Sequence, residues 1–202
     1  MSGLFITATD TAVGKTFVTL LLAQKLIENG FDVGVFKPIS CGPKKDNDAV
    51  YLKKELGLKD PFNLINPIQL KLPLAPYVAA KSLKKKIDRK KIFRAYKKLS
   101  KLHEIVLVEG VGGALVPIAG DYYVADLIKE LDIPTIIVAR AGLGTINHTL
   151  QTVETLRALR IPIMGIIMNG YKGKELSEET NDEAISKLSK LSILAKIPWQ
   201  KI

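Results

Sequence analysis

The residue types best suited to chemistry stand in a short stretch near the N-terminus, from Thr7 to Thr16. It follows an apolar run, Leu4-Phe5-Ile6, and leads into a helical pattern, so it is a predicted strand-to-helix turn. In such a turn, backbone N–H groups and the positive end of the helix dipole face phosphates. Gly14 lets the backbone approach closely, Lys15 brings a positive charge to the β- and γ-phosphates, and Thr16 offers a hydroxyl to Mg²⁺.

The stretch departs from the common phosphate-loop pattern at its start. That pattern has a glycine separated by four residues from the Gly-Lys pair, and Thr9 occupies the position here. Ala8 would take the role of the glycine in a loop that is longer by one residue. Gly-Lys-Thr is a common tripeptide, but its place at a strand-to-helix junction favours a phosphate-binding function.

Further charged residues follow other apolar runs. Glu109 closes one run, where a phosphate-loop enzyme places the carboxylate that helps to hold Mg²⁺; the alternative is a helix-capping or salt-bridging glutamate. Lys37 ends another run and is expected to point into the crevice beside Lys15, the alternative being a side chain that extends to solvent. Asp46 or Asp48 would complete the metal shell, although each alone is more often a helix cap.

The elements that must position these residues alternate along the chain. Strands are predicted at 3–7, 33–36, 104–109, 134–139, 163–168 and 193–197. Helices are predicted at 16–29, 48–56, 77–81, 88–102, 124–131, 146–159 and 178–191. This alternation predicts an α/β fold, a mostly parallel central sheet with helices on both faces, as in phosphate-loop NTPases.

No domain boundary is visible, so residues 1–202 are expected to form a single domain. Residues 57–76 contain four prolines and are predicted to be irregular, with no helix, and packed over the site because they are apolar. Ligands of such sheets bind beyond the carboxyl ends of the strands. The strand-end residues are therefore the candidate site: 9–16, Lys37, Glu109, the loop 140–147 and Asn169.

Composition excludes several other kinds of site. A single cysteine, Cys41, permits no internal disulfide and no cysteine zinc site, and no histidine is placed to activate it as a nucleophile. The N-terminus lacks a signal-peptide pattern and no apolar run approaches a membrane span, so a cytoplasmic protein without a membrane partner is expected.

The formal charge of +10 is concentrated between Lys81 and Lys101. A basic run can bind nucleic acid, but aromatic residues are sparse here and no recognition motif is present. The segment is therefore interpreted as the solvated face of a lysine-rich helix, and no nucleic-acid partner is expected.

Taken together, the motifs resemble those of the dethiobiotin synthetase family, in order over nearly the whole chain. The matching segments are Thr9-Asp10-Thr11-x-Val13-Gly14-Lys15-Thr16, Lys37-Pro38-Ile39-x-x-Gly42, Asn66-Pro67, Pro73-Leu74-Ala75-Pro76, Val108-Glu109-Gly110-x-Gly112-Gly113, Gly142-x-Gly144-x-Ile146-Asn147-His148 and Ile197-Pro198-Trp199. Ala8, Ala12 and Cys41 differ from the family's usual residues.

The resemblance implies an ATP-dependent cyclo-ligase of biotin synthesis that acts on 7,8-diaminopelargonic acid and CO₂ with ATP and Mg²⁺. It implies catalytic roles for Lys37, Lys15 and Thr11, and metal binding by Thr16, Asp48 and Glu109. Nucleotide contacts are implied for Ala12, Val13, Gly14, Lys15, Thr16, Phe17, Glu109, Gly112, Asn169 and Pro198. Substrate contacts are implied for Thr11, Lys37, Cys41, Gly144 and Asn147, the last two from the other subunit of a homodimer.

Three alternatives remain. A partitioning or switch-type ATPase that binds a protein partner usually carries an extra lysine early in the phosphate loop, and positions 8–12 contain none. A cobalamin-type amidotransferase would need a glutaminase half with a cysteine–histidine pair. A nucleotide-binding module without catalytic activity is the third.

Overall fold

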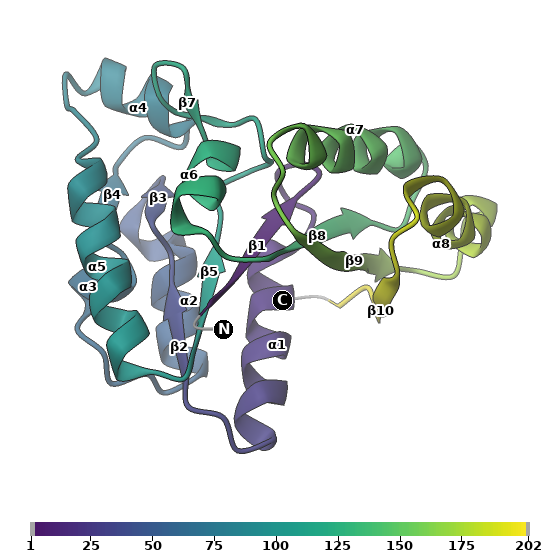
Figure 1. Cartoon of the computed structure of the whole chain (residues 1–202), viewed down its shortest axis with the longest axis horizontal. Helices are drawn as coiled ribbons and strands as arrows, with labels where there is room; N and C mark the ends of the chain where they lie inside the picture. Colours follow the sequence, from purple (N-terminus) through teal and green to yellow (C-terminus); the bar gives the residue numbers. More distant parts are fainter. Residues whose placement is uncertain (1–2, 201–202) are drawn as a thin grey trace.

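A six-stranded parallel sheet forms the centre of the protein, whose computed structural model describes residues 3–200. Its strands are β1 (Gly3–Ala8), β2 (Val33–Phe36), β5 (Ile105–Glu109), β8 (Thr135–Arg140), β9 (Ile163–Tyr171) and β10 (Ile193–Pro198). Their spatial order is β10-β9-β8-β1-β5-β2, and every neighbouring pair is parallel (Figure 1). The first strand of the chain therefore lies inside the sheet, between β5 and β8.

Helices cover both faces of the sheet because its strands bury side chains on both sides. In β1, Phe5 packs with the helices of one face and Ile6 with those of the other. The Phe5 face is covered by α5 (Arg89–Leu102), α6 (Val124–Leu131), α7 (Thr145–Ala158) and α8 (Leu176–Ser189). The Ile6 face is covered by α1 (Lys15–Glu28) and α2 (Asp48–Glu55). The predicted α/β architecture is confirmed.

Helix α5 shows how its sequence suits this position. Ile92, Ala95, Tyr96 and Leu99 recur at helical spacing and are buried against the sheet, whereas the lysines of the helix are exposed. The lysine-rich segment is thus the solvated face of a packed helix. Within residues 3–200, no helix is long and apolar enough to cross a membrane.

The segment between β2 and α5 is more ordered than its prolines indicate, and the prediction of no helix in 57–76 is wrong. It contains β3 (Ile39–Cys41), a 3₁₀ turn (Lys44–Asp46), α3 (Phe62–Ile65), β4 (Ile68–Leu70) and α4 (Pro76–Ser82). Strands β3 and β4 form a separate parallel pair. Each is three residues long and gains its order from a distant partner, so local periodicity does not reveal it.

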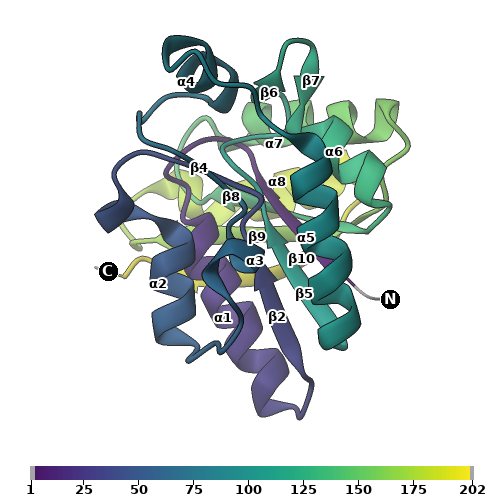
Figure 2. The same ribbon diagram turned by 90° about the vertical axis from the view of Figure 1, so that its left-hand side faces the viewer.

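A second small sheet was also not predicted. Strands β6 (Pro117–Ala119) and β7 (Tyr122–Tyr123) form an antiparallel hairpin before α6. Figure 2 shows this hairpin and α4 close together, at the end of the sheet where its strands have their carboxyl termini. The carboxyl ends of the central strands are therefore bordered by the connections from β2 to α5 and from β5 to α6.

Candidate functional site

The phosphate loop occupies residues 9–14, between β1 and α1. Ala8 is the last residue of β1; it is fully buried and paired with Val138, so its methyl group belongs to the core. Gly113 lies close by, and a Cβ there would come within 3.1 Å of the Ala8 carbonyl oxygen. The start of the loop therefore packs against the chain that follows β5. Ala8 belongs to strand β1 and not to the phosphate loop.

Gly14 is required where the loop enters α1. Its φ is 88°, in the left-handed region, and a Cβ would lie 2.1 Å from Asn169 Nδ2. Asn169, in β9, uses that nitrogen to donate a hydrogen bond of 2.8 Å to the carbonyl oxygen of Val13. The phosphate loop is therefore held in place by Asn169, one of the strand-end residues that the sequence identified.

Lys15 begins α1 and is 8% exposed. Burial, together with the nearby charge of Lys37, lowers the pKa of its ammonium to about 8. Among the described residues, its side chain makes no hydrogen bond or ion pair. A buried cation that makes no ion pair, at the start of a helix without a side-chain cap, is suited to an anionic ligand.

Lys37 lies at the end of β2 and is 2% exposed, so it does not extend to solvent. Its Nζ is 2.6 Å from Glu109 Oε1, 2.7 Å from Asp48 Oδ2 and 3.1 Å from the carbonyl oxygen of Gly110. Burial opposes the charge, but the two carboxylates outweigh it and raise the pKa of Lys37 above its ordinary value. Lys37 is thus a permanently charged group at the centre of the site.

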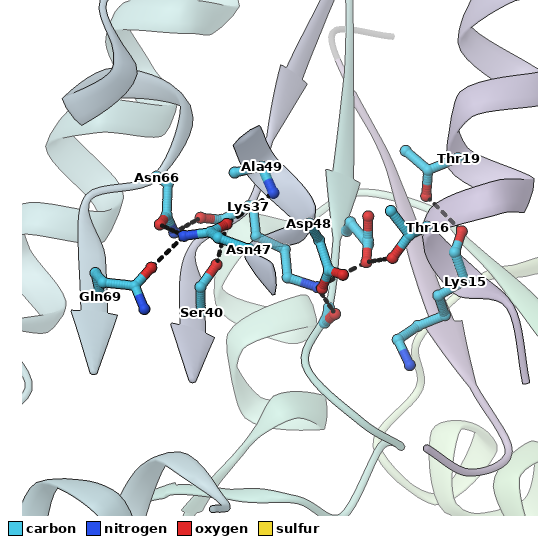
Figure 3. Close-up of polar contacts among 12 residues, drawn as sticks. Lys15, Thr16, Thr19, Lys37, Ser40, Asn47, Asp48, Ala49, Asn66 and Gln69 are labelled. Atoms are coloured by element: carbon cyan, nitrogen blue, oxygen red, sulfur yellow. Dashed lines mark hydrogen bonds and ion pairs between the residues drawn. The ribbon is translucent and has the colours of Figure 1, made fainter. Parts of the chain in front are cut away.

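The three residues predicted to bind metal, Thr16, Asp48 and Glu109, lie together around Lys37, and Figure 3 shows Thr16, Lys37 and Asp48 side by side. Thr16 Oγ1 donates to Glu109 Oε1 over 2.8 Å. Glu109 is fully buried, and its Oε2 has no hydrogen-bond partner in the described part of the chain. A hydroxyl and two carboxylates, one with a free buried oxygen, fit Mg²⁺, which takes a few protein oxygens and leaves other positions to phosphates and water.

Two clefts open on either side of the phosphate loop. The first has a volume of about 540 Å³, and Val13, Phe17 and Asn169 line it. The second has a volume of about 510 Å³ and is lined by the remaining predicted residues of the reaction centre: Thr11, Lys15, Thr16, Lys37, Cys41, Asp48, Glu109 and Gly112. Ala12 and Gly14 line both, so the clefts meet at the loop.

Cys41 contributes to the second cleft as a neutral group. Its side chain is partly buried, and this burial raises the pKa of the thiol to about 11, against the opposing charge of Lys37. The thiol therefore keeps its proton at neutral pH. This agrees with the sequence-based rejection of a nucleophilic cysteine.

Three predicted residues lie outside both clefts. Gly144 caps the N-terminus of α7 with a φ of 87°, and Asn147 is exposed on the first turn of that helix. Pro198 pairs with Tyr171 in the sheet, and the next residue, Trp199, lines the first cleft instead. The roles expected for Gly144 and Asn147 depend on a second subunit and stay predictions.

Two further residues help to shape the site: Arg140, which belongs to the predicted strand-end loop, and Glu178, which the sequence did not indicate. Arg140 lines the first cleft and links the loop to α7, with Nη2 3.4 Å from Asp10 Oδ2 and 3.1 Å from His148 Nδ1. Glu178 accepts hydrogen bonds from the backbone N–H groups of Lys172, Gly173 and Lys174, which holds the turn after β9. The strand-end position of Arg140 was a usable signal, but Glu178 resembles any surface glutamate in a helix.

The wall of the second cleft also contains residues that were only partly predicted. Ser40, Leu74 and Val111 line it together with Pro73 and Ala75. The sequence indicated that the apolar stretch up to residue 76 packs over the site, and residues 73–75 are in that position. Ser40 precedes Cys41 in β3, a strand that was not predicted.

Comparison with known proteins gives consistent results over the whole chain. A family model described as an AAA domain matches residues 2–202. The "ATP-dependent dethiobiotin synthetase BioD" of Nitrosopumilus maritimus is 43% identical, over 100% of this chain and 90% of that protein. Proteins with the same name from Methanococcus vannielii (46% identical, 82% of this chain and 78% of the relative) and Bacillus subtilis strain 168 (41% identical, 98% and 87%) are also similar.

Similar solved structures belong to a different group of ATPases. MinD of Aquifex aeolicus aligns with a TM-score of 0.62 at 17% identity, covering 98% of this chain and 82% of that one. A ParA family ATPase from Chlorobium tepidum aligns with a TM-score of 0.60 at 14% identity, over 100% and 86%. At this level of identity the likeness extends to the fold and no further.

Proposed function

The chain belongs to the dethiobiotin synthetase family, and we propose that it uses ATP to close a cyclic urea on 7,8-diaminopelargonic acid. The products would be dethiobiotin, ADP and phosphate. The observation that carries this proposal is the meeting of two clefts at one phosphate loop, where Ala12 and Gly14 line both. A nucleotide in the first cleft would present its γ-phosphate to a substrate held in the second.

The proposed reaction has three steps. One amine of the substrate adds to CO₂ and loses a proton, which gives a carbamate. A carbamate oxygen attacks the γ-phosphorus of ATP and displaces ADP, which gives a carbamic-phosphoric anhydride. The second amine attacks the carbamoyl carbon, loses a proton and expels inorganic phosphate as the ring closes.

The lysines of the site suit the second step, in which anionic groups must approach each other. Lys15 makes no direct ion pair among the described residues and is available to neutralise phosphate oxygens. Lys37 is held charged by Glu109 and Asp48 and faces the second cleft, beside the proposed carbamate. Such fixed charges stabilise a transferring phosphoryl group without reorganisation. Thr11 would lie where carbamate and phosphate meet.

The metal ion would be held by Thr16, Asp48 and Glu109, whose oxygens surround Lys37. When bound, Mg²⁺ would supply positive charge that offsets the negative charge of the nucleotide's phosphates. The protein's own part is to orient the two carboxylates and to keep Asp48 ionised. Lys37 does this, since its charge and hydrogen bond lower the pKa of Asp48, although partial burial opposes that shift.

The nucleotide would lie along the loop with its base in the first cleft. Val13, Phe17 and Asn169 line that cleft, and Trp199 offers its ring at the rim, where Lys172 Nζ lies 5.7 Å from the ring centroid. Pro198 would act by setting the position of Trp199. Gly112, in the second cleft, would admit the phosphates close to the backbone, since its φ of 63° disfavours a side chain.

We also infer a homodimer in which the tail of the substrate meets Gly144 and Asn147 of the other subunit. The N-terminus of α7 supports this, because Gly144 provides no side-chain cap and leaves the N–H groups of the first turn for a carboxylate. Leu143, just before it, is 82% exposed, which suits a residue covered by a second copy.

A coupled phosphate-release measurement tests the proposed reaction. The protein is supplied with ATP, Mg²⁺ and bicarbonate, and phosphate is followed with and without the diamine. Release should depend on the diamine, and mass spectrometry should detect the cyclic urea. Phosphate release at the same rate without the diamine would reject the synthetase proposal and favour a switch-type ATPase.

A further inference from the structure

A group of amide side chains lies directly behind the reaction centre, centred on Asn47. Asn47 and Asn66 are 5% and 4% exposed, and Gln69 completes the group at its partly buried edge. Asn47 Nδ2 donates to Asn66 Oδ1 over 3.0 Å and to Gln69 Oε1, while Asn47 Oδ1 accepts from Ser40 Oγ over 3.0 Å and from the N–H of Ala49 over 2.8 Å (Figure 3). Both hydrogens and both lone pairs of this amide are therefore used.

The orientation of each amide is set by the backbone at the edge of the group. Asn66 Nδ2 donates to the carbonyl oxygens of Lys37, over 2.7 Å, and Ile68. Gln69 Nε2 donates to the carbonyl oxygens of Gly42, over 2.9 Å, and Leu70. Because a backbone carbonyl can only accept a hydrogen bond, each of the two amides must direct its nitrogen to the carbonyl and its oxygen toward Asn47. Asn47 must therefore donate to both oxygens through its own nitrogen. No single amide can flip without leaving a buried polar group unpaired.

Asn47 thereby joins the two chain segments that carry the ion pair of the site. One is the end of β2, held through Asn66 at the backbone of Lys37. The other is the start of α2, which Asn47 caps and whose first residue is Asp48. Between these segments the chain passes through an exposed turn, Lys44–Asp46, which cannot by itself fix the distance from Asp48 to Lys37.

We propose that Asn47 is a positioning residue whose amide network holds the Asp48 carboxylate in register with Lys37 and the phosphate loop. It acts through the backbone and touches no reacting group. This inference rests on the proposed function for its metal site, but it concerns binding of the metal–nucleotide complex and not the identity of the second substrate. If the proposal holds, the Mg²⁺ dependence of nucleotide binding is affected by Asn47, a residue that lies outside both clefts.

Asn47→Ser isolates the network, because serine keeps an oxygen to cap α2 but loses both N–H donors. We expect binding of ADP with Mg²⁺, measured by calorimetry, to weaken about tenfold, as for other residues that orient metal ligands. Binding of ADP in EDTA should stay within about twofold, since the phosphate loop is unchanged. Asn47→Asp, which sets a carboxylate oxygen against the oxygens of Asn66 and Gln69, should lose at least as much.

Asp88→Ala is the matched control, because Asp88 caps α5 through the N–H of Lys91, away from the site. It should lower the melting temperature and leave both ADP affinities unchanged. If Asn47→Ser does not fold, Gln69→Ala removes one acceptor of the Asn47 amide, together with the two bonds from Gln69 to backbone carbonyls, and should show a smaller loss in the same direction. Wild-type Mg²⁺ dependence in the folded variant would overturn the proposal, as would equal losses with and without Mg²⁺.

These measurements use no diamine, so they separate the inference from the proposed function. A wild-type protein that binds Mg²⁺–ADP but does not convert the diamine would refute the function and leave the role of Asn47 open to the same comparison. Conversely, diamine-dependent turnover combined with an Asn47→Ser variant of unchanged metal dependence would refute the inference alone.

Discussion

Lys37 interacts with the other charged groups of the site. It is buried with two carboxylates, so removal of its ammonium would leave Glu109 and Asp48 facing each other without compensation. Its charge also reaches Lys15, whose pKa is lowered by burial and by this neighbour. Lys37 thus contributes to the lowered pKa values of both Lys15 and Asp48.

Lys37→Gln should abolish most of the ring closure while ADP binding is largely kept. Removal of a fixed charge at the transferring group is expected to slow turnover about 100-fold or more. Phosphate release and nucleotide calorimetry measure the two effects separately. Lys53→Gln serves as the control, because the ammonium of Lys53 donates to the Leu58 and Asp60 carbonyls on another side of α2. Loss of ADP binding in Lys37→Gln would show that Lys37 belongs to the nucleotide site.

Nucleotide affinity should fall as the pH rises above about 8. Lys15 has a pKa of about 8 in the free protein, and bound phosphates would raise it, so binding takes up a proton in that range. Affinity for metal-free ADP should fall roughly five- to tenfold between about pH 7.5 and 9. Calorimetry in buffers of different ionisation enthalpy would detect the proton uptake. A constant affinity over this range would mean that Lys15 does not face the phosphates.

Sequence reasoning found the charged residues of the site but not the bonds among them. Lys37, Glu109 and Asn169 were identified because they end apolar strands, and parallel strands end at one edge. The pairing of Lys37 with Asp48 depends on where α2 begins relative to β2. Asn47 and Gln69 gave no signal, since an isolated amide in a loop resembles an ordinary turn residue.

At the level of elements, the turn after β9 shapes the first cleft. Three successive N–H groups of this turn point at the Glu178 carboxylate, which lowers the pKa of Glu178 despite the opposing effect of burial. Helix α8 thus holds the turn that carries Lys172 toward Trp199. The first cleft is therefore shaped in part by α8, which contributes Glu178 to its lining.

Glu178→Ala should raise the KM for ATP about three- to tenfold with little change in kcat, because the loosened turn weakens binding of the base without touching the reacting groups. Steady-state kinetics at saturating diamine measures this split. Glu179→Ala, at the exposed neighbouring position of α8, is the control. A fall in kcat with unchanged KM would indicate that Glu178 has a different role.

His103 connects the ends of three elements at the end of the sheet where its strands have their amino termini. His103, after α5, lies 2.8 Å by Nδ1 from Asp32, which precedes β2, and 3.1 Å by Nε2 from Asp60, which precedes α3. Burial opposes protonation, but the two carboxylates raise the pKa of His103 above its ordinary value. Glu104 also lies beside the His103 group, since its carboxylate accepts a hydrogen bond from the backbone N–H of Asp32.

This contact should stabilise the fold more at low than at high pH. A raised folded-state pKa contributes stability that is fully present below about 6.5, the unfolded value, and is lost as the pH rises through the folded value. The difference in unfolding free energy between wild type and His103→Gln, from urea titrations, should therefore shrink from about pH 6 to 9. Asp32→Asn should weaken the dependence, and a difference that grows with pH would contradict the assignment.

The larger elements were predictable and the smaller ones were not. The six central strands and the helices on both faces were predicted to within a few residues, because each buries a long, strongly periodic surface. The short pair β3–β4 and the hairpin β6–β7 are held by partners and by the surrounding chain. Their sequences carry too few residues to show a period, and Pro61 and Pro67 favoured an irregular interpretation.

For the whole molecule, the proposed dimer gives a complementation test. If each site combines Lys37 of one subunit with Asn147 of the other, Lys37→Gln and Asn147→Asp homodimers should both be inactive. Random mixing gives one intact site in each heterodimer, so about a quarter of wild-type activity should return. Each protein is refolded alone and in the mixture, and turnover is compared. No recovery in a sample that contains heterodimers would place the complete site within one subunit.

The position of β1 has a consequence for how the protein is made. It is synthesised before the other strands of the sheet, but its neighbours begin at Ile105 and Thr135, and the residue that bonds to its loop is Asn169. The nascent chain must carry an unpaired apolar strand through most of translation, because no adjacent segment can cover it. We therefore expect the phosphate loop to reach its final form only after Asn169 has been synthesised, and a strand exposed for so long is an expected binding site for chaperones.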